Sequence, residues 1–151
     1  MSKENFFTNE YIPHIKKLKG NEQGSFGVLS PQGMIEHMTD SIGMAWERVK
    51  EPMQTAEIHL EKVRAFALSD RDFKPGVKNS LMTETAAPLR NATIEEAVKE
   101  LEAEVKSFLN YYKVNPSAVV TNPFFGDFNY EQWLHLLHKH ATHHLRQFNL
   151  V

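Results

Sequence analysis

The chain has 151 residues, with 17 lysine or arginine residues against 19 aspartate or glutamate residues. This length suits a single domain, spanning residues 1–151, with one substantial core. The balanced charge and the absence of like-charge runs indicate no nucleic-acid partner and no anionic membrane. Because the chain has no cysteine, disulfides and thiolate ligands are excluded, and any metal site must use nitrogen or oxygen ligands.

The beginning of the chain has no targeting pattern. Its first residues, MSKENFFTNEY, lack the basic start and apolar stretch of a secretory signal. No apolar run approaches the length that a membrane span requires. We therefore expect a cytoplasmic protein that does not insert into a membrane.

Four segments have the apolar periodicity of amphipathic helices. In the first, at residues 11–18, Pro13 indicates either a late start or a kink. The second begins at Ser30, a favourable N-cap, with Pro31 at the first helical position, and ends at about Pro52. Its apolar stripe consists of Ile35, Met38, Ile42, Trp46 and Val49.

The third and fourth helices follow a long connection. A capping box of Thr93 and Glu96 starts the third helix, and Asn115, followed by proline, ends it. The fourth helix is predicted at about residues 130–148, after Asn129 as its N-cap. One stripe of this helix contains Trp133, Leu137, His140, Ala141, His144 and Phe148.

The connections between these helices predict the topology. A short helix is expected within residues 56–67, whereas Ser69–Asn91 and Asn115–Asn129 have no usable period. A long crossover allows the second and third helices to run in the same direction, and short links make neighbours antiparallel. The prediction is an all-α, up-down-down-up four-helix bundle with a long crossover between helices 2 and 3.

Long unpatterned loops in a small protein usually have a function. We expect Ser69–Asn91 and Asn115–Asn129 to shape access to a site or a dimer contact. The second loop has enough aromatic area for a lid, a pocket wall or a partner surface, but the same rings are equally suited to closing the end of the bundle. These rings are Phe124, Phe125 and Phe128.

Two histidines one turn apart lie inside the apolar stripe of the last helix. His140 and His144 form an HxxxH pair, a weak motif by itself. If both rings are buried, each of their nitrogens needs a polar partner. A shared metal would bind one nitrogen of each ring. Hydrogen bonds to core carboxylates or to water are the alternative, and the spacing does not choose between them.

His37 is the candidate third ligand, because it lies beside the apolar stripe of the second helix. It is about 10 Å from the start of its helix, and the midpoint of His140 and His144 is about 9 Å from the end of theirs. If the two helices are antiparallel, the three rings come level. We expect His135, His138 and His143 to be solvated surface residues instead.

Other catalytic patterns are absent from the sequence. Ala141 follows His140, so there is no HExxH motif with its built-in glutamate base. The ExxH pairs of di-iron bundles, glycine-rich phosphate loops and the GxSxG motif are missing as well.

The stretches LSPQGMIEHM and HKHATHHLRQF resemble the DinB-like superfamily of metal-binding four-helix bundle proteins. That pattern has one histidine on the second helix, then HxxxH and a glutamine three residues later, at positions occupied here by His37, His140, His144 and Gln147. The stretch NPFFGDFNYEQWLHLLHKHATHHLRQFNL is most similar to an uncharacterised bacterial subgroup. Leu145 replaces an arginine that is frequent in the wider family, which is a departure from its thiol-transferase branch.

The resemblance implies a divalent metal, commonly zinc or nickel, held by three histidines with open coordination positions. It also implies a homodimer, and relatives include transferases and isomerases that depend on low-molecular-weight thiols. Such a metal either lowers the pKa of a bound water to about 7, which suits hydrolysis, or stabilises a substrate thiolate, which suits thiol transfer.

The leading hypothesis is therefore a metal-dependent enzyme, a hydrolase or a thiol S-transferase acting on a small-molecule substrate. Gln147 is the expected hydrogen-bond partner behind the ligands. The alternative is a non-catalytic bundle that binds a metal or a protein partner.

Overall fold

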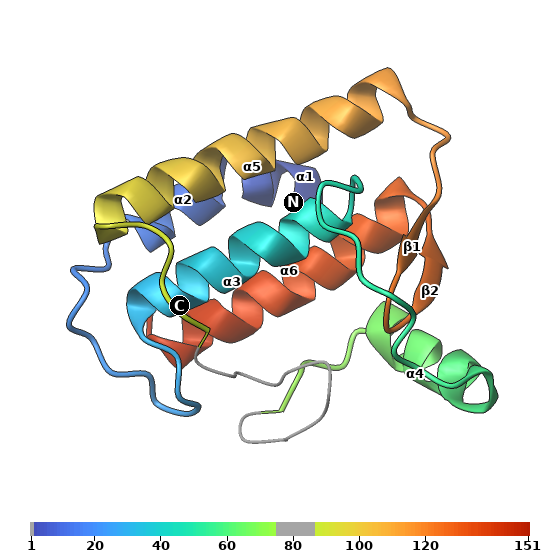
Figure 1. Cartoon of the computed structure of the whole chain (residues 1–151), viewed down its shortest axis with the longest axis horizontal. Helices are drawn as coiled ribbons and strands as arrows, with labels where there is room; N and C mark the ends of the chain where they lie inside the picture. The colour runs from blue at the N-terminus through green and yellow to red at the C-terminus, as the bar shows by residue number, and fades with distance from the viewer. Residues whose placement is uncertain (1, 75–86) are drawn as a thin grey trace.

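Helices contain most of the residues that the computed structural model describes, which are residues 2–74 and 87–151 (Figure 1). The predicted all-α class is broadly correct, apart from one small two-stranded sheet. The helices are α1 (Lys3–Asn5), the π-helix η1 (Phe6–Glu10), α2 (Tyr11–Ile15), α3 (Pro31–Met44), α4 (Glu57–Leu68), α5 (Ile94–Val114) and α6 (Tyr130–Gln147), and the strands are β1 (Val120–Asn122) and β2 (Gly126–Phe128).

The long helices lie side by side. Following the colours of Figure 1, α3 and α5 run in the same direction, and α6 returns in the opposite direction beside α3. Helix α3 packs mainly against α5, and it also contacts α6. Apolar side chains from α2, α3, α5 and α6 fill the space between them as one core. In the part of the chain that the structure describes, no helix is long and apolar enough to cross a membrane.

The N-terminal helical stretch starts earlier than the sequence pattern predicted. It begins at Lys3 and includes a π-turn, in which the N–H of Tyr11 donates to the carbonyl of Phe6. Pro13 therefore does not delay the start. It lies in the first turn of α2, directly after the irregular π-turn, where the missing N–H of proline costs least.

Helix α3 ends at Met44, well before the predicted end near Pro52. The chain turns at Glu47, whose φ is +67°, and the N–H of Arg48 donates back to the carbonyl of Gly43 at 3.0 Å. A Cβ atom on Gly43 would lie 2.6 Å from Nη2 of Arg48, so the glycine allows the guanidinium to fold over the helix end. The predicted stripe was longer because Trp46 and Val49 keep the helical spacing after the helix has ended at Met44.

The sequence suggested that the connection between α5 and α6 is irregular throughout, but the structure contains two short strands there. β1 and β2 form an antiparallel hairpin in which Thr121 pairs with Asp127. Each strand has only three residues, too few for a period of two to be recognised in the sequence. Phe125 and Phe128 are buried and stack with their ring centroids 6.1 Å apart. Their burial supports a packing role for these rings at the end of the long helices.

Helix α4 confirms the short helix expected in the long connection. Its Arg64 donates to the carbonyl of Phe125 at 3.1 Å and lies over the ring of Phe128, so α4 is held against the hairpin. Part of the predicted irregular segment Ser69–Asn91, namely residues 75–86, lies outside the described residues.

Helix α6 begins where the sequence indicated. The side chain of Asn129 accepts from the N–H of Gln132, and the side chain of Gln132 accepts from the N–H of Asn129. This reciprocal capping box satisfies two donors at the helix start.

Candidate metal centre

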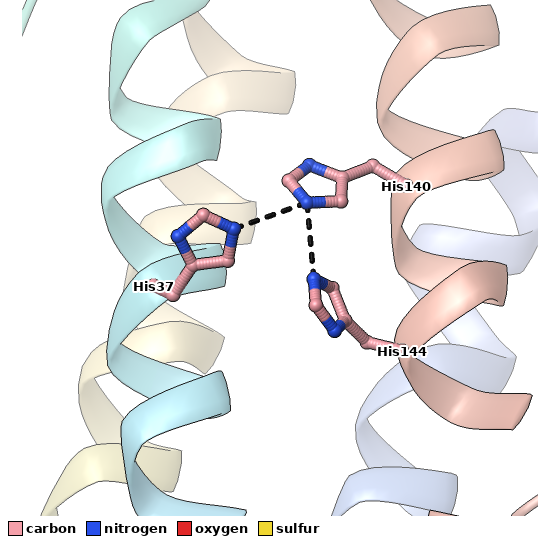
Figure 2. A group of neighbouring side chains, drawn as sticks. All are labelled: His37, His140 and His144. Atoms are coloured by element: carbon pink, nitrogen blue, oxygen red, sulfur yellow. Dashed lines mark hydrogen bonds between the residues drawn. The ribbon is translucent and has the colours of Figure 1, made fainter. Parts of the chain in front are cut away.

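Three histidines converge from two helices (Figure 2). His37 projects from α3, and His140 and His144 project from α6, one turn apart. The Nε2 atom of His140 lies 3.1 Å from Nε2 of His37 and 3.1 Å from Nε2 of His144. The potential ligand atoms of all three residues lie within 4.8 Å of one another. The structure thus brings together the three residues that the sequence singled out as metal ligands.

Gln147 determines which nitrogen of His144 carries the proton. Its Oε1 lies 2.7 Å from Nδ1 of His144 and can only accept, so Nδ1–H donates to it. The Nε2 atom of the neutral ring therefore presents a lone pair to the cluster. The amide group of Gln147 donates in turn to the carbonyl of Phe26 at 2.8 Å, which holds the glutamine in this orientation.

The three rings cannot satisfy one another by hydrogen bonding alone. Nε2 of His140 is in contact with two other nitrogens, and in a neutral ring it offers either one N–H or one lone pair. A proton on His140 can point well at only one of its neighbours. A cation among the three atoms would accept every lone pair at once.

Burial keeps these rings in the neutral form that binds metals. Burial, together with the neighbouring ring of His37, lowers the pKa of His144 to about 3, although the hydrogen bond to Gln147 opposes part of this shift. Burial also lowers the pKa of His140 well below its ordinary value and lowers that of His37, although the charge of Asp40 partly opposes the second shift. Metal binding near neutral pH therefore requires no proton to be displaced from them.

His143 is buried, so its prediction as a solvated surface residue was wrong. Its ring packs against the rings of Phe26, at a centroid distance of 4.9 Å, and Phe73, at 6.0 Å. Phe73 also lies 6.1 Å from the ring of His140. Both phenylalanines lie in segments without periodicity, so no sequence signal placed them beside the histidines.

The face of α6 that was predicted to be exposed is partly covered by α4 and the residues after it. His135 is half-buried and its Nε2–H donates to the carbonyl of Ser69 at 2.7 Å. Lys139 is buried and donates to the carbonyl of Phe66 at 2.8 Å. His138 is also half-buried, against the ring of Phe6. Periodicity indicated a polar face, but it could not show that another segment covers it.

Acidification should destabilise the metal-free protein. In the unfolded chain a histidine titrates near 6.5, whereas folded His144 titrates at about 3, so the unfolded state binds more protons between these values. The free energy of unfolding should therefore fall as the pH falls through this window. Urea unfolding with a chelator present, at about pH 7 and about pH 5.5, measures the difference.

The exposed His59 provides a control for this pH dependence. The His59→Gln variant should keep the full pH effect, because this side chain is exposed and does not belong to the histidine cluster. Equal unfolding free energies of the wild-type protein at the two pH values would contradict the assignment of neutral, buried rings.

A predominantly helical fold in which nitrogens of three histidines, two buried and one partly buried, converge from two helices defines a candidate metal-binding protein. The sequence profile of the DinB superfamily matches residues 16–148. The chain therefore belongs to the DinB superfamily, a superfamily of metal-binding proteins, as the sequence motifs suggested. No curated protein and no solved structure matches the chain.

Proposed function

We propose that this protein binds one divalent first-row metal ion through Nε2 of His37, His140 and His144, and that the metal serves catalysis. The observation that carries this proposal is the convergence of three histidine nitrogens, from buried His140 and His144 and partly buried His37, that cannot satisfy one another. Membership of a metal-binding superfamily supports it independently.

The donor set fits zinc or nickel. Zinc–nitrogen distances of about 2.0–2.1 Å in a tetrahedral site place two nitrogen ligands about 3.3 Å apart. The two Nε2–Nε2 contacts of 3.1 Å are close to that separation. Three neutral ligands leave the charge of the ion intact, and three-ligand sites of this kind keep a position for water or substrate.

A metal in this site supplies Lewis-acid chemistry, which suits either hydrolysis or the activation of a low-molecular-weight thiol. The protein's own residues hold and shield the donors. Gln147 orients the ring of His144 through Nδ1. Phe26 and Phe73 cover the adjacent His143 with apolar rings, which limits water on that side of the cluster.

The arrangement of the helices supports the predicted bundle. We propose that the α1–α2 stretch, α3, α5 and α6 are the four helices of an up-down-down-up bundle, since α3 and α5 run together and α6 runs against them (Figure 1). The homodimer implied by the family resemblance stays a prediction, for which light scattering of the purified protein is the measurement.

Cobalt-substituted protein tests whether the site is open to substrates. After loading with one equivalent of Co²⁺, we expect the visible absorption spectrum to change on addition of azide or of a small thiol, because either enters a free coordination position. A thiol-to-cobalt charge-transfer band would favour thiol chemistry over hydrolysis. A spectrum that neither ligand alters would contradict the catalytic proposal and support a structural metal in a non-catalytic protein.

A further inference from the structure

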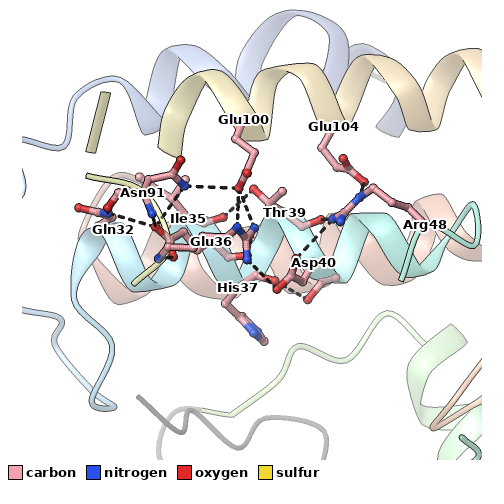
Figure 3. Close-up of polar contacts among 12 residues, drawn as sticks. Gln32, Ile35, Glu36, His37, Thr39, Asp40, Arg48, Asn91, Glu100 and Glu104 are labelled. Atoms are coloured by element: carbon pink, nitrogen blue, oxygen red, sulfur yellow. Dashed lines mark hydrogen bonds and ion pairs between the residues drawn. The ribbon is translucent and has the colours of Figure 1, made fainter. Parts of the chain in front are cut away.

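A buried carboxylate lies directly before the candidate ligand of α3. Glu36 is only 6% exposed. Its Oε1 accepts from the backbone N–H of Arg90 at 2.8 Å, and its Oε2 accepts from the backbone N–H of Asn91 at 3.1 Å. Oε2 also accepts from the side-chain amides of Asn91 and Gln32, at 3.2 and 3.0 Å. Every polar partner of this carboxylate is therefore a donor (Figure 3).

The contacts of Glu36 continue into a chain of ion pairs between α3 and α5. The guanidinium of Arg90 binds Glu100 of α5 at 2.7 Å and Asp40 of α3 at 3.0 Å. Asp40 is shared with Arg48, which binds Glu104 of α5 at 2.6 Å. Figure 3 shows His37 projecting away from this network. The network thus holds the side of α3 that is turned away from the histidine cluster.

The three candidate ligands depend on the fold to different degrees. His140 and His144 lie one turn apart on α6, so a single helix sets their separation. His37 comes from α3, and its distance from the other two depends on where α3 is held. Since α3 packs mainly against α5, the groups that join α3 to α5 and to residues 90–91 determine that position.

We propose that Glu36 is a positioning residue for the metal centre. By fastening residues 90–91 to α3, it holds the helix at the height and rotation that bring His37 to the other two rings. This inference rests on the proposed function, because its effect is measured at the metal.

The variant Glu36→Gln tests this role with almost no change of shape. All partners of Glu36 are donors, so the amide nitrogen would face an N–H group in either orientation. We expect about a tenfold loss of Co²⁺ affinity, the lower end of the effect of removing a group hydrogen-bonded to a ligand, because Glu36 acts through the position of α3, and we expect a changed cobalt absorption spectrum.

Glu104→Gln is the matched control. Glu104 is equally buried, at 7% exposed, and it belongs to the same network. Its Oε1 accepts from both Trp46 and Arg48, so the carbonyl oxygen of a glutamine can keep both hydrogen bonds. Even if this variant loses some stability, we expect its Co²⁺ affinity and its cobalt spectrum to stay those of the wild-type protein.

The outcomes separate this inference from the proposed function. Failure of the wild-type protein to bind Co²⁺ would refute the proposed function itself. If the wild-type protein binds Co²⁺, unchanged affinity and an unchanged spectrum in Glu36→Gln would overturn the positioning role. A loss of Co²⁺ affinity in Glu104→Gln as large as that in Glu36→Gln would also overturn it. If Glu36→Gln does not fold, Asn91→Ala removes one donor to Glu36, and wild-type affinity and spectrum in that variant would overturn the role.

Discussion

Replacing His140 by alanine is expected to abolish stoichiometric metal binding. Of the three histidines, His140 has the Nε2 atom that contacts both of the others, at 3.1 Å each. Its removal leaves only His37 and His144 as ligands, and two nitrogens hold a divalent ion far more weakly than three converging ones. Metal analysis of untagged, dialysed protein should fall from about one equivalent to nearly none.

His138→Ala is the control for this experiment. Its ring lies on the same helix but packs against Phe6, with 4.7 Å between ring centroids. The metal content of this variant should equal that of the wild-type protein. Equal metal content in the His140→Ala and wild-type proteins would remove the basis of the proposed site, and a loss in His138→Ala alone would place the metal elsewhere.

Replacing Phe125 by alanine is expected to destabilise the protein by about 3–5 kcal/mol, the usual cost of removing a buried aromatic ring. Phe125 is 3% exposed and stacks on Phe128, and its backbone carbonyl accepts a hydrogen bond from Arg64. Equilibrium urea unfolding of metal-free protein measures the loss. Metal content should be unchanged, because the hairpin lies near the start of α6, whereas the histidines lie in its second half (Figure 1).

The Phe124→Ala variant distinguishes the contribution of Phe124 to stability from that of the adjacent Phe125. Phe124 is only partly buried, so its removal should cost considerably less than the removal of Phe125. If both variants keep wild-type stability, the rings do not pack the end of the core as the structure indicates. Reduced metal binding in either variant would instead connect the hairpin to the histidine site, which was the other hypothesis drawn from the sequence.

Local sequence patterns predicted most of the helices and identified the three candidate metal ligands. The capping box at Asn129 and the apolar stripe of α6 placed His140 and His144 on the inward face of one helix. These signals are readable because capping and helical spacing involve residues only three or four positions apart. The same reasoning placed His37 at the level of the pair, and its contact with His140 agrees with that prediction.

The ends of elements and the exposed faces were predicted less well. The stripe beyond Met44 kept its period, but the chain leaves the helix and turns at Glu47, whose φ is +67°, and no sequence pattern indicated a positive φ at a glutamate. Two three-residue strands were missed because a period of two needs more residues to be recognised. In both cases the feature covers too few residues for a periodic pattern to reveal it.

The sequence by itself determined the helical class, the DinB motifs and the three histidines, because each depends on residue types at short, regular spacing. Only the tertiary structure decided what surrounds them. It buried His143 between Phe26 and Phe73, covered Lys139 with the end of α4, and joined Glu36 to residues 90–91. Those contacts connect segments far apart in the chain, and they form only when the helices that carry them pack together.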